Sequence, residues 1–463
     1  MVDLLLASNR GPVSYTEDDD GQLVVRRGGG GLVSALAGVG GETVWVCAAL
    51  TPADRRAVRT GGVDVAGLRM LDIDEVVFHR AYDRVANSLL WFVAHLLCSP
   101  ATSPTFDASS RREWAGYETY CAAFADALCA EASPGARVLV QDYHLSLVPA
   151  MLRERRPDLR ISHFSHTPWA PPQYFRLLPD DVARRLLEGL LGADALGFLS
   201  PRWADAFGRC CADVLAANWD GSAVHHAGRT TTVSVHPLGV DGSELRARAA
   251  QPDVVGRSET VRETVGDRRL VLRIDRTELS KNIVRGLLAY AELLRTRPQW
   301  RERVVHLAFA YPSRHDLPEY REYTAAVQRT AREVNEEFAT PGWLPVVLQV
   351  RDDYARSLAA YELADVLVVN PVRDGMNLVA KEGPVLSRDG LALVLSREAG
   401  AADQLGGDAL MVNPYDVSQT AEAMHRALLM PRDERLARCD RLAAAATALP
   451  PSAWLAAQLA ALD

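Results

Sequence analysis

The chain has 463 residues, 48% of them hydrophobic and 24% charged, which is the composition of a soluble globular protein long enough for two domains. The formal net charge of −8 argues against a nucleic acid as the main partner, because phosphate-backbone binding depends on clustered Lys and Arg. No apolar run is long enough to cross a bilayer, and Asp3 stands where a secretory signal would carry positive charge. Seven cysteines without metal-binding spacing favour buried thiols in a cytoplasmic protein.

Short apolar runs alternate with longer helical stretches along the chain, a pattern typical of parallel sheets with helices on both faces. Expected strands of the first half are 4–7, 44–47, 138–141, 161–165, 195–198 and 232–235. Those of the second half are 270–274, 304–309, 346–350, 366–369, 391–395 and 409–412. The pattern predicts two doubly wound α/β domains, 1–239 and 240–463. The chain is expected to end in two helices separated at 449–452, with Ser452 capping the second.

Arg10 and a glycine run follow the first expected strand. The acidic run 18–20 before Gly21 indicates a solvated hairpin turn rather than a metal site. Four consecutive glycines at 28–31 then precede a helix-like segment. Such a run forms a backbone nest that can contact a diphosphate, and a flexible loop is the alternative.

The first half carries further candidates for sugar binding. Tyr82 and Trp91, in YDRVANSLLW, can form an aromatic rim for a sugar ring, or they are two core aromatics of a helix. Asp142 follows an expected strand, and His166 emerges just past the next, in HTPWAPP. A histidine there can bond a substrate hydroxyl or share a proton near neutral pH, and a structural histidine is the alternative.

Cations follow the strands of the second half. Arg276 and Lys281 lie in RIDRTELSKN near a helix start, which suits a diphosphate leaving group. Arg314 follows another strand. Surface salt bridges are the alternative for any single cation.

RDGMNLVAKEG, at 373–383, connects an apolar strand to a helix. Asp374 can accept sugar hydroxyls, and Gly375 permits close backbone approach. Backbone N–H groups at the helix start, from 377 to 379, can bind phosphate. A nucleotide sugar fits this combination, although an Asp and an Asn that only cap the helix are the alternative.

Together these motifs resemble the retaining trehalose-6-phosphate synthases, in order and spacing along nearly the whole chain, and RDGMNLVAKE is very specific to that family. The resemblance implies a GT-B fold, two Rossmann-like domains facing across a cleft. The first would bind the acceptor and the second the donor, with the terminal helix crossing back to the first domain. It also implies glucosyl transfer from GDP- or UDP-glucose to glucose 6-phosphate, without a metal or other cofactor.

The resemblance assigns a role to each matching residue. The catalytic residues are Arg276, Lys281, His166 and Asp374. The donor-binding residues are Gly30, Gly31, Arg276, Lys281, Asp374, Gly375, Met376, Asn377, Leu378, Val379 and Glu382. The acceptor-binding residues are Arg10, Tyr82, Trp91, Asp142 and Arg314. Because no enzyme nucleophile stands out, we expect a front-face reaction in which the departing phosphate oxygen takes the acceptor proton.

The chain departs from the family where synthases often have LDYSKG, since it carries Glu278 and Asn282 in TELSKN. Three alternatives stay open: a pseudo-glycosyltransferase joining a GDP-cyclitol to an amino-cyclitol phosphate, a non-catalytic regulatory subunit, and a nucleotide-sugar epimerase. Similarity to actinomycete-type chains rich in Ala, Arg and Gly favours GDP over UDP. A homo-oligomer is possible, and no membrane partner is expected.

Overall fold

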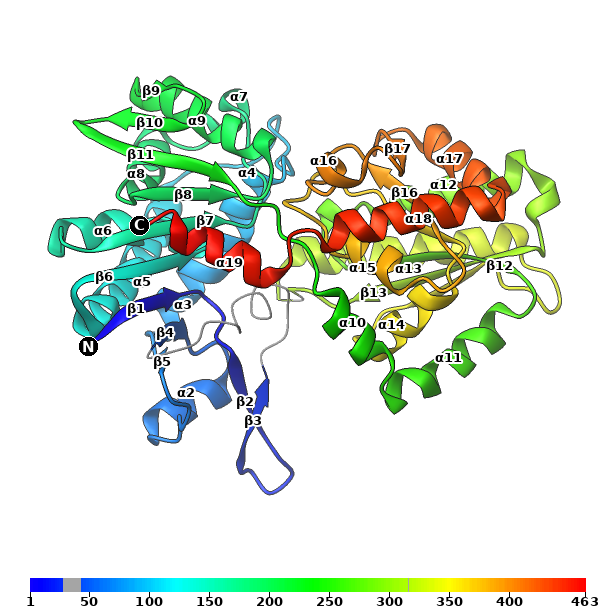
Figure 1. Cartoon of the computed structure of the whole chain (residues 1–463), viewed down its shortest axis with the longest axis horizontal. Coiled ribbons are helices and arrows are strands. Elements are labelled where there is room, and N and C mark those ends of the chain that lie inside the picture. Colours follow the sequence, from blue (N-terminus) through cyan, green and yellow to red (C-terminus); the bar gives the residue numbers. More distant parts are fainter. Residues whose placement is uncertain (28–42, 315) are drawn as a thin grey trace. The chain divides into compact units, whose positions relative to one another are not determined.

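The computed structural model describes residues 1–27, 43–314 and 316–463. The chain splits into two compact units, one formed by Met1–Leu238 together with Pro451–Asp463 and the other by Gly239–Pro450. Each unit is built on its own sheet with helices around it (Figure 1). Within the described residues, no helix is both long and apolar enough to cross a membrane.

The first unit contains a nine-stranded sheet in the order β5-β4-β1-β6-β7-β8-β11-β10-β9. Its strands are β1 (Val2–Ala7), β4 (Thr43–Ala48), β5 (Leu68–Leu71), β6 (Ala132–Gln141), β7 (Arg160–Ser165), β8 (Ala195–Phe198), β9 (Asn218–Trp219), β10 (Ala223–His226) and β11 (Arg229–Val235). Neighbours pair in parallel except at β10, which is antiparallel to both β9 and β11. The inner strands are buried apolar runs because helices cover both faces.

The described helices of the first unit lie between these strands along the chain, apart from the last one. They are α2 (Pro52–Arg59), α3 (Glu75–His79), the π-helix η1 (Arg80–Leu90), α4 (Trp91–Ala94), α5 (Ala108–Glu131), the 3₁₀ turn η2 (Tyr143–Leu145), α6 (Val148–Arg155), α7 (Pro172–Phe175), α8 (Asp180–Leu191), α9 (Pro201–Leu215) and the terminal α19 (Pro451–Ala460). A separate hairpin, β2 (Val13–Glu17) with β3 (Leu23–Arg27), turns at Asp18, which confirms the expected hairpin.

The second unit contains a six-stranded parallel sheet in the order β14-β13-β12-β15-β16-β17. Its strands are β12 (Arg269–Arg276), β13 (Val304–Tyr311), β14 (Val346–Gln349), β15 (Val366–Val369), β16 (Ala392–Ser396) and β17 (Leu410–Val412). The order reverses between β12 and β15, because β13 and β14 extend the sheet on one side and β16 and β17 on the other.

The second unit is helical outside this sheet. Its helices are α10 (Gly242–Ala249), α11 (Pro252–Val265), the 3₁₀ turn η3 (Leu279–Lys281), α12 (Ile283–Thr296), the 3₁₀ turn η4 (Pro298–Trp300), α13 (Pro318–Phe338), α14 (Tyr354–Leu363), α15 (Val379–Leu386), α16 (Ala402–Leu405), α17 (Val417–Leu429) and α18 (Arg432–Thr447).

All twelve expected strands are present, and the predicted α/β fold with two doubly wound sheets is confirmed. The expectation missed β5, β9 and β10, which are short strands at the two ends of the first sheet. Such edge strands lack the continuous apolar run of a central parallel strand. The two terminal helices are present, but Ser452 lies inside α19 rather than capping it, because the helix begins at Pro451.

Candidate functional site

The second unit offers a ligand position where its strand order reverses. In open α/β sheets, ligands bind outside the carboxyl ends of the strands at such a switch point. Here the two strands that flank the switch are β12 and β15, which pair directly. The chain leaves β12 through a turn that contains Lys281, and it leaves β15 through the loop that contains Asp374. Two residues 93 positions apart are thereby brought to one edge of the sheet.

Lys281 and Asp374 form an ion pair at this position. Lys281 Nζ lies 2.5 Å from Asp374 Oδ2, and their side chains are only 13% and 14% exposed. Asn377 Nδ2 donates to the same oxygen at 3.0 Å. Burial lowers the pKa of Lys281, but the negative charges of Asp374, Asp275 and Glu278 outweigh it and raise that pKa overall. The ammonium group is therefore a fixed positive charge at neutral pH.

The start of α15 adds backbone donors beside this pair. Asn377 has a positive φ of 84°, and its Oδ1 accepts a hydrogen bond from Ala380 N at 3.1 Å. The N–H groups of Leu378 and Val379 donate no hydrogen bond to any residue that the structure describes. Unpaired N–H groups at a helix start attract anions. The two features that RDGMNLVAKEG was expected to offer a nucleotide sugar, the Asp374 carboxylate and the N–H groups at the helix start, therefore lie together.

The loop that follows β16 contacts the Asp374 loop through backbone hydrogen bonds. Asp374 N donates to Glu398 O at 3.2 Å, and Ala401 N donates to Met376 O at 2.8 Å. The two loops approach so closely that a Cβ on Gly400 would lie 1.9 Å from Gly375 O. This contact keeps Met376 buried and fixes the course of the Asp374 loop.

Glu382, the expected ribose contact, lies on α15 with its carboxyl group buried against Tyr361. Tyr361 Oη donates to Glu382 Oε2 at 3.1 Å. Burial raises the pKa of Glu382 to about 7, although the Tyr361 hydrogen bond acts in the opposite direction. The sequence did not indicate Tyr361, because a helical tyrosine 21 positions earlier carries no local signal.

Arg276 and Arg314 share a buried carboxylate that sequence reasoning did not identify as their partner. Arg276 Nη1 lies 2.9 Å from Glu278 Oε1, and Arg314 Nη1 lies 3.9 Å from the same oxygen. Arg314 also donates to Tyr320 Oη at 2.5 Å. The Arg276 side chain is half exposed at the end of β12, so an anion can reach it there.

A fully buried ion pair lies under the Lys281 turn. Arg273 Nε donates to Asp275 Oδ2 at 2.8 Å, and Arg273 Nη2 donates to the Lys281 carbonyl at 2.7 Å. Burial raises the pKa of Asp275 to about 6, while Arg273 and Lys281 act to lower it. These residues fix the backbone that carries the Lys281 ammonium.

In the first unit, Asp142 and His166 follow the neighbouring strands β6 and β7. Asp142 Oδ1 accepts from His166 N at 3.2 Å, and His166 Nε2 lies 2.9 Å from Gln141 Oε1. Burial, with a smaller contribution from His163, lowers the pKa of His166 to about 3. The ring is therefore neutral at physiological pH in this structure, and proton sharing with a bound substrate stays a prediction. Hydrogen bonding to a sugar hydroxyl by the neutral ring stays a prediction.

The aromatic residues of YDRVANSLLW lie on two consecutive helices. Tyr82, on η1, is half-buried between Phe78 and His144. Its ring centroid lies 5.1 Å from that of Phe78 and 5.7 Å from that of His144. Trp91, the first residue of α4, is 8% exposed and stacks on His95 at 3.9 Å. Trp91 is therefore a core aromatic in this structure, as the alternative held, and its acceptor role stays a prediction.

Three expected ligand-binding residues remain, Arg10, Gly30 and Gly31. Arg10 is exposed after β1, and Gly30 and Gly31 lie outside the described residues. Across residues 1–27, 43–314 and 316–463, no three His, Cys, Asp or Glu side chains gather as metal ligands. The metal-independent reaction stays a prediction.

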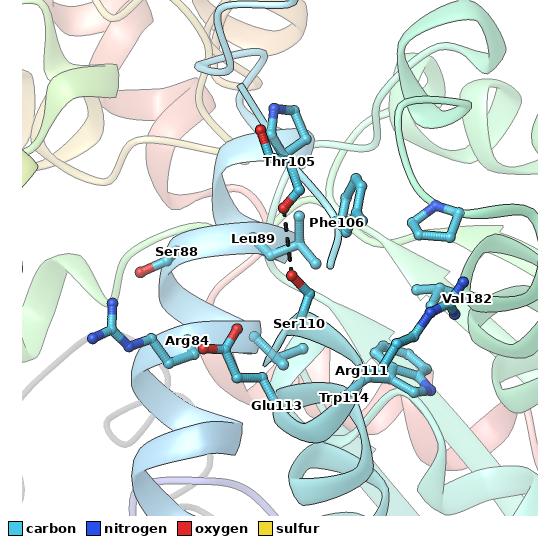
Figure 2. Close-up of a pocket in the computed structure, with 13 residues that line it drawn as sticks. Arg84, Ser88, Leu89, Thr105, Phe106, Ser110, Arg111, Glu113, Trp114 and Val182 are labelled. Carbon is cyan, nitrogen blue, oxygen red and sulfur yellow. Dashed lines mark hydrogen bonds between the residues drawn. The ribbon is translucent and has the colours of Figure 1, made fainter. Parts of the chain in front are cut away.

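A half-open cavity of about 190 Å³ lies elsewhere, beside η1 and α5 of the first unit (Figure 2). Arg84, Glu113 and Trp114 are among its lining residues, and Ser110 Oγ donates to Thr105 O at 3.4 Å across one side. None of the predicted donor or acceptor residues lines it. The candidate site is therefore defined by Lys281, Asp374 and the start of α15, and not by this cavity.

Comparison with known sequences gives a consistent result. A model of glycosyltransferase family 20 matches residues 3–463. The chain is 34% identical over 452 residues to the bifunctional trehalose-6-phosphate synthase/phosphatase of Thermoproteus tenax, covering 94% of this chain and 60% of that protein. It is 32% identical over 444 residues to alpha,alpha-trehalose-phosphate synthase (UDP-forming) 1 of Arabidopsis thaliana, covering 93% and 46%. The chain thus spans roughly half the length of these relatives.

The fold also matches solved structures along its whole length. A structure described as trehalose-6-phosphate from E. coli bound with UDP-2-fluoro glucose aligns with a TM-score of 0.86 and 26% identity. The alignment covers 99% of this chain and 98% of that one. The expected GT-B fold is confirmed by this match.

Proposed function

The chain belongs to glycosyltransferase family 20, and we propose that it is a retaining glucosyltransferase that makes alpha,alpha-trehalose 6-phosphate. The donor is a nucleoside-diphosphate glucose and the acceptor is glucose 6-phosphate. The observation that carries the proposal is the Lys281–Asp374 pair at the sheet's switch point, beside the free N–H groups that open α15. A cation, a sugar-hydroxyl acceptor and an anion-binding helix start are the parts that a nucleotide sugar requires.

In the proposed reaction, the bond between the glucose anomeric carbon and the diphosphate oxygen breaks on the face where the acceptor hydroxyl attacks. A new bond forms from that carbon to the acceptor oxygen, and the departing phosphate oxygen takes the hydroxyl proton. Arg276 and Lys281 stabilise the negative charge that develops on the diphosphate. Asp374, held by Lys281 and Asn377, orients the glucose by accepting its hydroxyls.

We propose UDP-glucose as the preferred donor. The Arabidopsis relative is named as UDP-forming, and the E. coli structure is described with a UDP-linked sugar. These descriptions count for more than the composition that favoured GDP. Glu382 would hold the ribose, which both nucleotides share.

The proposal also covers how the acceptor is bound, where the protein acts and how it assembles. Arg10, Tyr82, Trp91 and Asp142, with Arg314, would hold glucose 6-phosphate. The reaction would take place in the cytoplasm without a metal or a nucleic-acid partner, and a homo-oligomer stays possible.

The test measures nucleotide release from UDP-glucose and from GDP-glucose, each with and without glucose 6-phosphate, in the presence of EDTA. We expect release only with acceptor, faster from UDP-glucose, and a product with the mass of a disaccharide phosphate. Arg276→Ala should lower turnover about 100-fold or more. Arg295→Ala, which removes a surface ion pair to Glu337, is the matched control and should leave turnover unchanged.

Other outcomes would identify the alternatives. Turnover only with an amino-cyclitol phosphate would indicate a pseudo-glycosyltransferase. Tight binding of glucose 6-phosphate without turnover of either donor would indicate a regulatory subunit. Near-normal turnover by a folded Arg276→Ala variant would contradict the role given to that arginine.

A further inference from the structure

Glu278 lies between two cations that the proposed function gives to different ligands. Arg276, at the end of β12, is assigned to the donor diphosphate, and Arg314, after β13, to the acceptor phosphate. Both guanidinium groups approach one atom, Glu278 Oε1, at 2.9 and 3.9 Å. Ser313 Oγ, adjacent to Arg314 in the chain, donates to the same oxygen at 3.0 Å. One carboxylate oxygen therefore connects the ends of two neighbouring strands.

The Glu278 carboxylate is charged in spite of complete burial. Its side chain is 0% exposed. Burial raises its pKa, but Arg276 and Arg314 outweigh burial and lower the pKa to about 2. Its second oxygen, Oε2, has no hydrogen-bond partner among the described residues. A buried carboxylate with one unpaired oxygen depends on its cations, so the geometry of Arg276 and Arg314 is tied to it.

The two arginines need such an anchor to different degrees. Arg276 is half exposed and would otherwise sample many rotamers, since an arginine side chain carries substantial rotamer entropy. Arg314 is 14% exposed and has a second contact at Tyr320 Oη. Two cations and one carboxylate leave a net positive charge, so the cluster can still bind an anion.

We propose that Glu278 is a positioning residue that fixes Arg276 for the donor diphosphate and Arg314 for the acceptor phosphate at the same time. The inference rests on the proposed function for the identity of the two ligands. Glu278 itself is buried and acts only through the arginines. A Glu side chain carries its carboxylate about 1.5 Å further from the backbone than an Asp side chain would.

The test compares Glu278→Gln, Arg314→Ala and the double variant. Glu278→Gln keeps the shape and removes the charge, so we expect the KM for the donor and the KM for glucose 6-phosphate each to rise about 10-fold. In the Arg314→Ala background, Glu278→Gln should still raise the donor KM but should not raise the glucose 6-phosphate KM further. A purely structural role would not separate the two constants in this way.

Two further variants keep the test decisive. Glu278→Asp retains the charge, so it should restore the donor KM through Arg276 better than the acceptor KM through the more distant Arg314. Ser313→Ala removes a neutral hydrogen bond from the same oxygen and should change either KM by less than about threefold. Melting temperatures of all variants show which of them fold, and Glu278→Asp carries the test if Glu278→Gln does not.

The proposal is overturned if Glu278→Gln leaves kcat and both KM values unchanged, or if its effect on the glucose 6-phosphate KM adds fully to that of Arg314→Ala. Calorimetric titration with UDP and with glucose 6-phosphate gives the same comparison without turnover. An inactive wild-type enzyme that binds both ligands would contradict the proposed function alone, whereas unchanged binding by Glu278→Gln would contradict the positioning role alone.

Discussion

Glu382 has a buried carboxyl group that titrates near neutral pH. Its pKa is raised from 4.5 to about 7 by burial. The folded state therefore binds more protons than the unfolded state between these two values, and the free energy of unfolding must fall as pH rises through this window. We expect Glu382→Gln to remove the fall and to be more stable than the wild type by ~2 kcal/mol at pH 8. Chemical denaturation at pH 5 and pH 8 measures the difference.

The same group gives UDP binding a pH dependence if Glu382 holds the ribose. Hydroxyl donors favour the ionised carboxylate, so binding must draw its proton away, and UDP affinity should rise as pH increases from 6 to 8. Glu382→Gln should bind UDP weakly at every pH. Glu333→Gln, on the exposed face of α13, is the control for both measurements. A stability difference that does not change between pH 5 and pH 8 would contradict the raised pKa.

At the residue scale, the sequence indicated Lys281 and Asp374 because each follows a recognisable apolar strand. It did not indicate that the two form an ion pair, since their contact depends on the order of β12 and β15 in the sheet. Glu278 was visible only as a departure from a family motif. Its partner Arg314 comes from another strand, and the burial that makes this carboxylate unusual is a property of the folded chain.

Asn282 determines how one element passes into the next. It has left-handed backbone angles, φ 59° and ψ 37°, between η3 and α12. Its Nδ2 donates to Asn370 O at 2.9 Å and to Pro414 O at 2.7 Å. Asn tolerates this conformation better than most residues other than glycine. The side chain thus ties the turn after β12 to the ends of β15 and β17.

We expect substitutions of Asn282 to separate these two contributions. Asn282→Gly keeps the backbone conformation but loses these two hydrogen bonds and the one that Oδ1 accepts from Arg285 Nη1 at 2.9 Å, and should cost about 1–3 kcal/mol of stability. Asn282→Ala loses the same hydrogen bonds and keeps a Cβ in the left-handed region, which Ala tolerates less well than Asn or Gly, so it should cost about 1 kcal/mol more. Thermal unfolding of both variants gives the order. Equal losses would show that the left-handed conformation does not contribute.

At the element scale, the central strands were predictable because parallel strands that are buried on both faces have continuous apolar sequences. The 11-residue π-helix η1 was not. It contains Tyr82 in a sequence that also fits an α-helix, and a π-helical register depends on packing against neighbours rather than on local propensity. The expected position of the two aromatics on helices is therefore confirmed, and their role as a rim for a sugar stays a prediction.

The whole molecule is divided so that the chain enters the second unit once and leaves it once. The entry is at Gly239 and the exit at Pro450. Gly239 N donates to Leu449 O at 2.9 Å, and a Cβ at Gly239 would lie 2.4 Å from that oxygen. The sequence indicated the entry point through the end of one strand series. That the last helix packs within the first unit came only from the family resemblance, because a short Ala-rich helix has no sequence feature that names its partner.

The terminal helix α19 is therefore expected to stabilise the first unit, although it follows the second in the chain. Trp454 and Gln458 on this helix are 2% and 1% exposed. The Trp454 ring packs edge-on against Phe164 at 4.9 Å, and Gln141 Nε2 donates to Gln458 Oε1 at 3.0 Å. Figure 1 shows α19 along β6 and β7. Deleting 451–463 should destabilise one unit and leave the other unchanged.

Calorimetry of the full chain, of residues 1–450 and of Trp454→Ala tests this expectation. The truncation should lower the temperature of one unfolding transition and leave the other unchanged. Trp454→Ala should lower the free energy of unfolding of that same transition by about 3–5 kcal/mol. Ser452→Ala, at an exposed position of α19, is the control. Because Trp454 also covers the His166 ring, with centroids 5.5 Å apart, truncation should raise the pKa of His166 from about 3 toward 6.5. Equal shifts of both transitions, or none, would show that α19 does not belong to the first unit in stability.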